Sequence, residues 1–301
     1  MVKVFVSYNH KQGAWVWDRL VPVLKAGGTE VLIDIDRFKV GYAVIGQMDA
    51  TQDQAEKHLL CLSADYLASD YCRHEMERAI ALDPGFASGI VLPIRLDGAP
   101  IPSLIAAYNP LYADLSDDRR AKPWADMLLA CDANLGVDVP TWLSARDEVL
   151  RWIEDGHSVN LLVGGDGIAW RALFKDFCTR IRKAVAAVEL TDPETFTRPG
   201  FLSEVFKQLG SVQPLPKKPQ DLVVFGRRIK EMPKPAVLAL THFDRVADLF
   251  PSDKDLFAAL RWAVTEQRKI VLLVQSRSRF ADLVPRDNAL SLIPIKTVEL
   301  A

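Results

Sequence analysis

The sequence feature that most constrains the fold is an alternation of short, wholly apolar segments with longer segments of helical periodicity. In the first part of the chain the apolar segments are residues 4–7, 31–33, 59–62 and 90–94. Strands that are apolar on both faces are typical of a parallel sheet covered by helices on either side. The chain should therefore begin with an α/β fold. The expected helices are residues 16–24, kinked at Pro22, a segment after Gly41, a segment from Ser69 onwards, and residues 122–131.

The same alternation starts again after residue 140. Here the expected strands are residues 159–163, 237–240, 270–274 and 290–295, and the expected helices are residues 143–153, 170–188 and 256–266. At 301 residues the chain is long for one domain. Residues 133–140 have little apolar periodicity and are expected to be a linker. We therefore predict two α/β domains, residues 1–132 and 141–301.

Composition narrows the class of protein. Net charge is −2 and no block of like charges occurs, so the sequence carries no signal for nucleic-acid or membrane-surface binding. No apolar run reaches the roughly 20 residues that span a bilayer, and the amino terminus lacks a signal-peptide core, so we expect a cytosolic protein. Four separated cysteines and five histidines show no metal-ligand spacing, and no metal site is expected.

In a doubly wound sheet, ligands bind beyond the carboxyl ends of the strands. Three segments should lie there: Ser7–His10, Asp34–Gly41 and Ser63–Glu75. On the third of these, helical periodicity puts Cys72 and Met76 on the buried face and Glu75 at its edge, while Glu77 points to solvent. Glu75 is thus a candidate for chemistry. The alternative is an ordinary surface glutamate on an amphipathic helix.

Three sequence boxes resemble those of TIR (Toll/interleukin-1 receptor) domains. They are Val4-Phe5-Val6-Ser7-Tyr8, Ile33-Asp34 through Gly41, and Leu62-Ser63 through Ser69-Asp70-Tyr71-Cys72-Arg73-His74-Glu75, with Leu92-Pro93-Ile94 following. The resemblance covers about residues 1–132. Similarity to the bacterial branch of this family implies a flavodoxin-like fold and cleavage of NAD at the nicotinamide–ribose bond by a glutamate of the third helix, which here is Glu75.

This reaction needs few groups. Nicotinamide leaves NAD as a neutral base, so no general acid is required, and one carboxylate can stabilise the cation that develops on the ribose. NAD is the substrate and no cofactor is expected. The substrate-binding residues that the resemblance implies are Phe5, Ser7, Tyr8, Asp36, Arg37, Gly41 and Tyr71.

Two of these regions have a second interpretation. Tyr71 could stack on a flat base or could serve only helix packing. The loop from Asp36 to Gly41 could close over substrate, could contact a neighbouring protomer, or could be a solvated loop. The sequence also departs from the family in two places: Lys11-Gln12-Gly13 replaces a common acidic residue, and Tyr71 stands where many relatives carry tryptophan.

The second domain resembles signal-transduction (STAND) ATPases of the P-loop class that have lost their chemistry. The turn Gly164-Gly165-Asp166-Gly167 stands in the place of a phosphate-binding loop but lacks the lysine and hydroxyl of that motif. Thr241 replaces the metal-binding aspartate that would follow strand 237–240. The resemblance implies an inactive nucleotide-binding fold. The alternative is an unrelated α/β domain with a glycine turn.

Together these features predict an NAD+ glycohydrolase of the bacterial immune or anti-phage kind, activated by oligomerisation. Homo-oligomers would form through the TIR domains, and a protein partner or sensor would act through the C-terminal domain. Two alternatives remain: a TIR scaffold or adaptor without catalysis, and a cyclase that makes a cyclic ADP-ribose signal.

Overall fold

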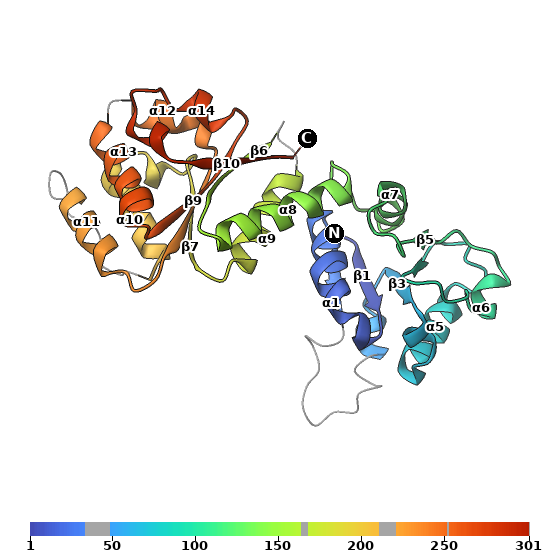
Figure 1. The fold of residues 1–301 in the computed structure, drawn as a ribbon. Coiled ribbons are helices and arrows are strands. Elements are labelled where there is room, and N and C mark those ends of the chain that lie inside the picture. The colour runs from blue at the N-terminus through green and yellow to red at the C-terminus, as the bar shows by residue number, and fades with distance from the viewer. Residues whose placement is uncertain (34–48, 164–167, 211–220, 252, 301) are drawn as a thin grey trace. The chain divides into compact units, whose positions relative to one another are not determined.

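Two compact units make up the chain, Met1–Leu143 and Ser144–Ala301. The computed structural model describes residues 1–33, 49–163, 168–210, 221–251 and 253–300 (Figure 1). The boundary between the units falls inside one helix, α8 (Val139–Glu154). This helix begins inside the segment that the sequence suggested as a linker, which has no helix or strand from residue 133 to residue 138.

The first unit is built on a five-stranded sheet in the order β2-β1-β3-β4-β5, and every pair in it is parallel. This is the strand order of flavodoxin-like folds. The α/β prediction is therefore confirmed. The strands are β1 (Lys3–Ser7), β2 (Glu30–Leu32), β3 (Lys57–Leu62), β4 (Val91–Arg95) and the short β5 (Ala113–Asp114), which the sequence did not predict.

Helices connect these strands. They are α1 (Gly13–Trp15), α2 (Val21–Ala26), α4 (Ala64–Leu67), α5 (Asp70–Leu82), α6 (Ser103–Ala106) and α7 (Ala121–Ala130). A π-helical turn at Val16–Leu20 joins α1 to α2, so the expected irregularity lies just before Pro22, which occupies the first turn of α2. Of the helix expected after Gly41, only residues 49–52 fall within the described residues, and they are helical.

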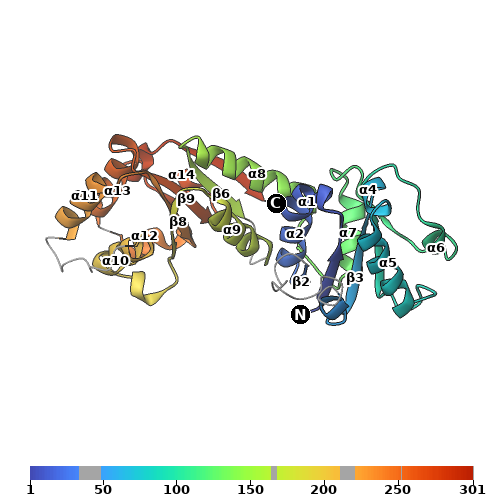
Figure 2. The same cartoon turned by 90° about the horizontal axis from the view of Figure 1, so that it is seen from below.

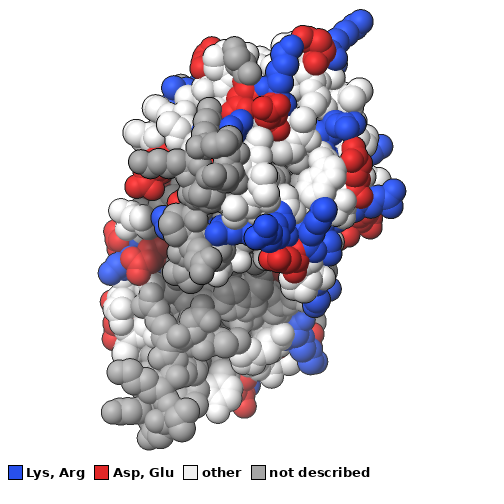
Figure 3. All heavy atoms as spheres, turned by 90° about the vertical axis from the view of Figure 1, so that its left-hand side faces the viewer, with Lys and Arg blue, Asp and Glu red and all other residues white. Residues whose placement is uncertain are grey.

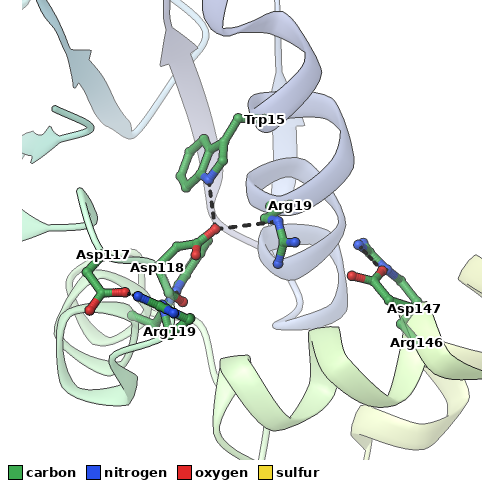
Figure 4. A network of polar contacts seen from close by, with 8 residues as sticks. Trp15, Arg19, Asp117, Asp118, Arg119, Arg146 and Asp147 are labelled. Atoms are coloured by element: carbon green, nitrogen blue, oxygen red, sulfur yellow. Dashed lines mark hydrogen bonds and ion pairs between the residues drawn. The ribbon is translucent and has the colours of Figure 1, made fainter.

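Two helix layers cover the first sheet. The ring of Trp15 stacks on that of Trp124 at 5.7 Å, which packs α1 against α7. Asp118 fixes this contact, because its carboxylate accepts a hydrogen bond from Trp15 Nε1 (3.1 Å) and pairs with Arg19 (3.4 Å), as Figure 4 shows. Helix α5 lies beside β3 in both Figure 1 and Figure 2. Its apolar face packs on Leu60 and Leu62 of that strand.

The second unit contains another five-stranded parallel sheet, in the order β10-β6-β9-β8-β7. Its strands are β6 (Ser158–Val163), β7 (Ala184–Glu189), β8 (Ala236–Thr241), β9 (Ile270–Ser276) and β10 (Ile295–Leu300). Its helices are the second part of α8, then α9 (Ile168–Arg180), α10 (Arg198–Gln208), α11 (Asp221–Glu231), α12 (Val246–Leu249), α13 (Lys254–Arg261) and α14 (Phe280–Leu283). Strand β9 is buried along its whole length, as expected of a central strand.

Two sequence predictions for this unit were wrong. The helix expected over residues 170–188 ends at Arg180, and Ala184–Glu189 forms β7. Its alanines favour helix, but every residue of β7 is paired with one of β8, and this tertiary pairing outweighs local propensity. The strand expected at residues 290–295 is instead a 3-10 turn, Ala289–Leu292, and the strand follows it as β10, which pairs with β6.

The structure also shows where charged side chains lie and whether side chains or helices could hold a metal ion or span a membrane. Basic and acidic side chains are interspersed on the face shown in Figure 3. Among the described residues, no group of three or more His, Cys, Asp or Glu side chains is placed to hold a metal ion. None of the helices described here is both long enough and apolar enough to cross a membrane.

Candidate active site at the carboxyl ends of β1 and β3

The first sheet has its topological switch point between β1 and β3, where ligands of this fold class bind. Ser7 is the last residue of β1, and Ser63 follows β3. Ser63 caps α4 by accepting a hydrogen bond from the Tyr66 amide (3.1 Å), and Ser69 caps α5 through the Cys72 amide (3.4 Å). These two caps turn the chain so that α5 runs back along the sheet next to β1.

Three polar side chains meet at this point. Ser7 Oγ donates a hydrogen bond to Glu75 Oε2 at 2.5 Å and lies 2.7 Å from the Tyr66 hydroxyl. All three side chains are buried. The sequence separations are 68 residues for Ser7 and Glu75 and 59 for Ser7 and Tyr66, so only the folded sheet brings them together.

Glu75 is held more deeply than its sequence position suggested. The buried face of α5 consists of Cys72, Glu75, Met76 and Ala79, so Glu75 belongs to that face and only 3% of its surface is exposed. Glu77 is exposed, as predicted. Gln52, also buried, donates from Nε2 to the backbone oxygen of Glu75 at 2.9 Å and fixes this turn of the helix.

Three buried titratable groups of this unit have shifted pKa values. Burial raises the pKa of the Tyr66 phenol well above its usual range. Burial, followed in size by the effects of Cys72 and Glu75, also raises the pKa of the Cys61 thiol. Burial lowers the pKa of His58 to about 4, with Asp53 opposing the shift and Arg78 adding to it. Tyr66, Cys61 and His58 therefore carry no charge at neutral pH.

The other predicted substrate-binding residues differ in how they are placed. Phe5 is completely buried and packs against His58 at 6.1 Å between ring centroids. Tyr8 is almost buried, and its hydroxyl accepts a hydrogen bond from Trp17 at 3.2 Å. Tyr71 is 57% exposed, so its ring does not serve core packing and is accessible to a ligand. Asp36, Arg37 and Gly41 lie outside the described residues.

The loop after β1 is tied to the segment after β3. Lys11 Nζ pairs with Asp65 at 2.6 Å, and Asn9 donates to the backbone oxygen of the same residue at 3.0 Å. Lys11, at one of the places where the sequence departs from the family, thus links the loop after β1 to α4. Sequence reasoning missed Tyr66 and Gln52 as site residues, although Tyr66 falls in a segment that it had placed at this edge.

In the second unit, aromatic and polar groups of the chain contact one another at the corresponding edge of the sheet. Trp170, in the first turn of α9, packs edge-to-face on His242 after β8 at 5.4 Å. His242 has a left-handed backbone (φ 54°), and its amide donates to Gln275 at 2.9 Å. Asp244 accepts hydrogen bonds from the amides of Arg277 and Ser278 at 2.9 to 3.1 Å. The turn at residues 164–167 lies outside the described residues.

The first unit is therefore a flavodoxin-like α/β domain with a buried carboxyl group at its switch point. Comparison with known families agrees: residues 4–129 match the family model described as TIR domain, and this part of the chain belongs to that family. Over 109 residues the sequence is 25% identical to Toll-like receptor 6 of Bos taurus. That match covers 36% of this chain and only 14% of the receptor.

Two solved structures are similar to parts of the chain. The TIR domain of the Toll-related receptor TRR-2 from Hydra magnipapillata covers 43% of this chain and 97% of its own, with 18% identity and a TM-score of 0.38. A Walker-type ATPase of Pyrococcus abyssi covers 51% of this chain and 53% of its own, with 16% identity and a TM-score of 0.36. The parallel α/β architecture of each unit rests on its own strand order.

Proposed function

We propose that the TIR unit is an NAD+ glycohydrolase that cleaves the nicotinamide–ribose bond, with Glu75 as the catalytic carboxylate. One observation carries this proposal: the carboxyl group of Glu75 lies buried at the switch point and accepts a hydrogen bond from the Ser7 hydroxyl. A negative charge in such a water-poor setting stabilises a developing positive charge far better than a solvated glutamate would. The cation formed on the ribose as nicotinamide leaves is the charge to be stabilised.

The burial of Glu75 supports activation by assembly. With 3% of its surface exposed, Glu75 is reached by a dinucleotide only after a rearrangement of the residues that cover it. Free energy for this rearrangement can come from association of protomers. The monomer would then be silent and the homo-oligomer active, as the family resemblance implies.

An apolar groove of about 510 Å³ between β4 and α7 is a suitable surface for that association. Leu111 and Leu129 line it and are 99% and 76% exposed. Strand β5 pairs with β4 only at Ile94 and Arg95, so residues 91–93 of β4 have no strand partner on that side among the described residues. Exposed leucines beside an open strand edge are typical of protein interfaces. A second copy of the TIR unit is the proposed occupant.

For the C-terminal unit, about residues 141–301 after a linker at 133–140, the proposed role is assembly or recognition of a protein partner without nucleotide hydrolysis. Asp244, the acidic residue after β8, is engaged by two backbone amides. Trp170 and His242 contact each other where a nucleotide phosphate would approach the helix. The whole chain would then be a cytosolic effector of the immune kind.

A TIR scaffold without catalysis is the second candidate. The apolar groove favours it, because a surface for association serves assembly with or without catalysis. The two candidates differ in one measurement, the loss of NAD in concentrated protein.

The test compares three proteins at high concentration: wild type, Glu75→Gln and Glu77→Gln. Glutamine keeps the size of Glu75 and its hydrogen bond with Ser7 but removes the negative charge. We expect NAD cleavage to fall about 100-fold or more in Glu75→Gln and to be unchanged in Glu77→Gln, which lies on the same helix with its side chain exposed. NAD that persists with wild-type protein would favour the scaffold, and equal activity in the three proteins would refute the role of Glu75.

A further inference from the structure

We infer that Tyr66 and Ser7 form a one-directional hydrogen-bond chain that orients the Glu75 carboxylate, so that both are positioning residues rather than substrate-binding ones. The inference deepens the proposed function and rests on it. The chain has two links, 2.7 Å from the Tyr66 hydroxyl to Ser7 Oγ and 2.5 Å from Ser7 Oγ to Glu75 Oε2.

The direction of the chain follows from proton counting. In the ionised form that the proposed reaction requires, the Glu75 carboxylate can only accept, so the single hydroxyl proton of Ser7 goes to Glu75. Ser7 then has no proton left for Tyr66, and the Tyr66 hydroxyl donates to Ser7. Because burial keeps the Tyr66 phenol protonated, this donor persists across the physiological pH range. Each donor also polarises the next one, which strengthens the bond to the carboxylate.

Burial separates this role from substrate binding. Ser7 is 1% exposed and Tyr66 is 0% exposed, and in this arrangement the one hydroxyl proton of Ser7 is committed to Glu75. A ribose hydroxyl therefore meets Glu75 without a contact to Tyr66. Three elements hold the three members: β1 carries Ser7, α4 carries Tyr66, and α5 carries Glu75. The capping bond from the Tyr66 amide to Ser63 fixes the start of α4 and so the position of the phenol.

A merely structural hydroxyl pair would predict a different outcome. If Tyr66 only fills space in the core, its loss changes stability and leaves the chemical step intact. If it orients Glu75 through Ser7, its loss lowers kcat and leaves KM nearly unchanged, because no contact with substrate is removed. The two roles are separated by kinetics.

The kinetic experiment uses the full chain at a concentration at which wild type cleaves NAD. Tyr66→Phe and Ser7→Ala should each lower kcat about five- to thirtyfold, with KM within about twofold of wild type. The double variant should be little worse than either single one, since both break the same chain. Tyr108→Phe, which removes an exposed hydroxyl of the same unit, is the control and should leave kcat unchanged. An unchanged kcat in Tyr66→Phe, or a change confined to KM, would overturn the inference.

A spectroscopic experiment tests the hydrogen-bond chain independently of NAD cleavage. With 13C at the tyrosine Cζ, the six tyrosines of the protein give six NMR signals, and Tyr66→Phe identifies the one from Tyr66. This signal should shift in both Ser7→Ala and Glu75→Gln, because the hydroxyl's hydrogen bonding depends on both partners. If wild type fails to cleave NAD, the proposed function is refuted. The shift of the Tyr66 signal then still tests whether the hydrogen-bond chain exists. A Tyr66 signal that moves in neither variant would refute it.

Discussion

Both sheets are parallel, but the acidic residues at their carboxyl ends have different hydrogen-bond partners. In the first unit the switch point holds Glu75, which accepts a hydrogen bond from the Ser7 hydroxyl next to the neutral phenol of Tyr66. In the second, Asp244 is bound by backbone amides of the chain, and Trp170 and His242 pack on each other. The lesson is that strand order creates a crevice, whereas the residues at its edge decide whether chemistry can occur there.

Loss of association through the groove should lower NAD cleavage by the first unit. In Leu129→Glu, a charge replaces an exposed leucine of the groove between β4 and α7. We expect NAD cleavage at a fixed protein concentration to fall roughly tenfold to thirtyfold, as for loss of a central interface residue. The measurement is NAD loss against protein concentration.

The measurement includes a control variant and a series of protein concentrations. Leu104→Glu, at an exposed leucine of α6 outside the groove, should behave as wild type. Activity per molecule should rise steeply with concentration in wild type and only at much higher concentration in Leu129→Glu. Activity strictly proportional to concentration in both proteins would show that the monomer is self-sufficient.

The strands differ in how well the sequence predicted them. Strands β1, β3, β6 and β8 were predictable because each is rich in apolar residues, and Ser69 was predictable as the start of α5 because it is a capping residue. Strand β7 was not, since its alanines and valines become a strand only through pairing with β8. Periodicity alone cannot assign such a segment.

The candidate site was predictable in its residue types and not in its contacts. Glu75 and Ser7 could be singled out from motif and position, but a bond across 68 residues exists only once β1 and β3 are neighbours. Tyr66 escaped because a buried tyrosine hydroxyl looks in sequence like any aromatic residue of an amphipathic helix. Its role depends on a partner that periodicity does not show.

Acid should destabilise the first unit through His58. Burial lowers the pKa of His58 from 6.5 to about 4 in the folded state, so between these pH values the unfolded chain binds a proton that the folded chain does not. Stability is therefore fully present above pH 6.5 and decreases as the pH falls towards 4, by about 3 kcal/mol at most. Hydrogen exchange of the β3 amides at pH 7 and pH 4.5 measures this loss.

The matched variants are His58→Leu and His10→Gln. His58→Leu removes the titrating group, whose Nδ1 has no partner among the described residues, and should flatten the decrease. His10 is exposed, and His10→Gln should leave the acid-dependent decrease in stability unchanged. The same acid-dependent loss in all three proteins would show that another group causes it.

The smallest expected effect concerns the second unit. ATP with Mg²⁺ should not change its melting temperature, because a ligand raises the stability of a protein only by binding its folded state. The physical reason is the absence from Gly164-Gly165-Asp166-Gly167 of the lysine and hydroxyl that hold phosphate and metal. Differential scanning calorimetry of the full chain with increasing ATP measures this. A saturable rise would show a working nucleotide site.

The most direct test of the contrast between the two crevices is NAD loss in two variants of the full chain, Glu75→Gln and Asp244→Asn. Each changes one acidic residue at the edge of one sheet to the amide of the same size. We predict that Glu75→Gln abolishes NAD cleavage while Asp244→Asn retains the activity of wild type. Cleavage retained in Glu75→Gln, or lost in a folded Asp244→Asn protein, would contradict the assignment of the chemistry to the first crevice.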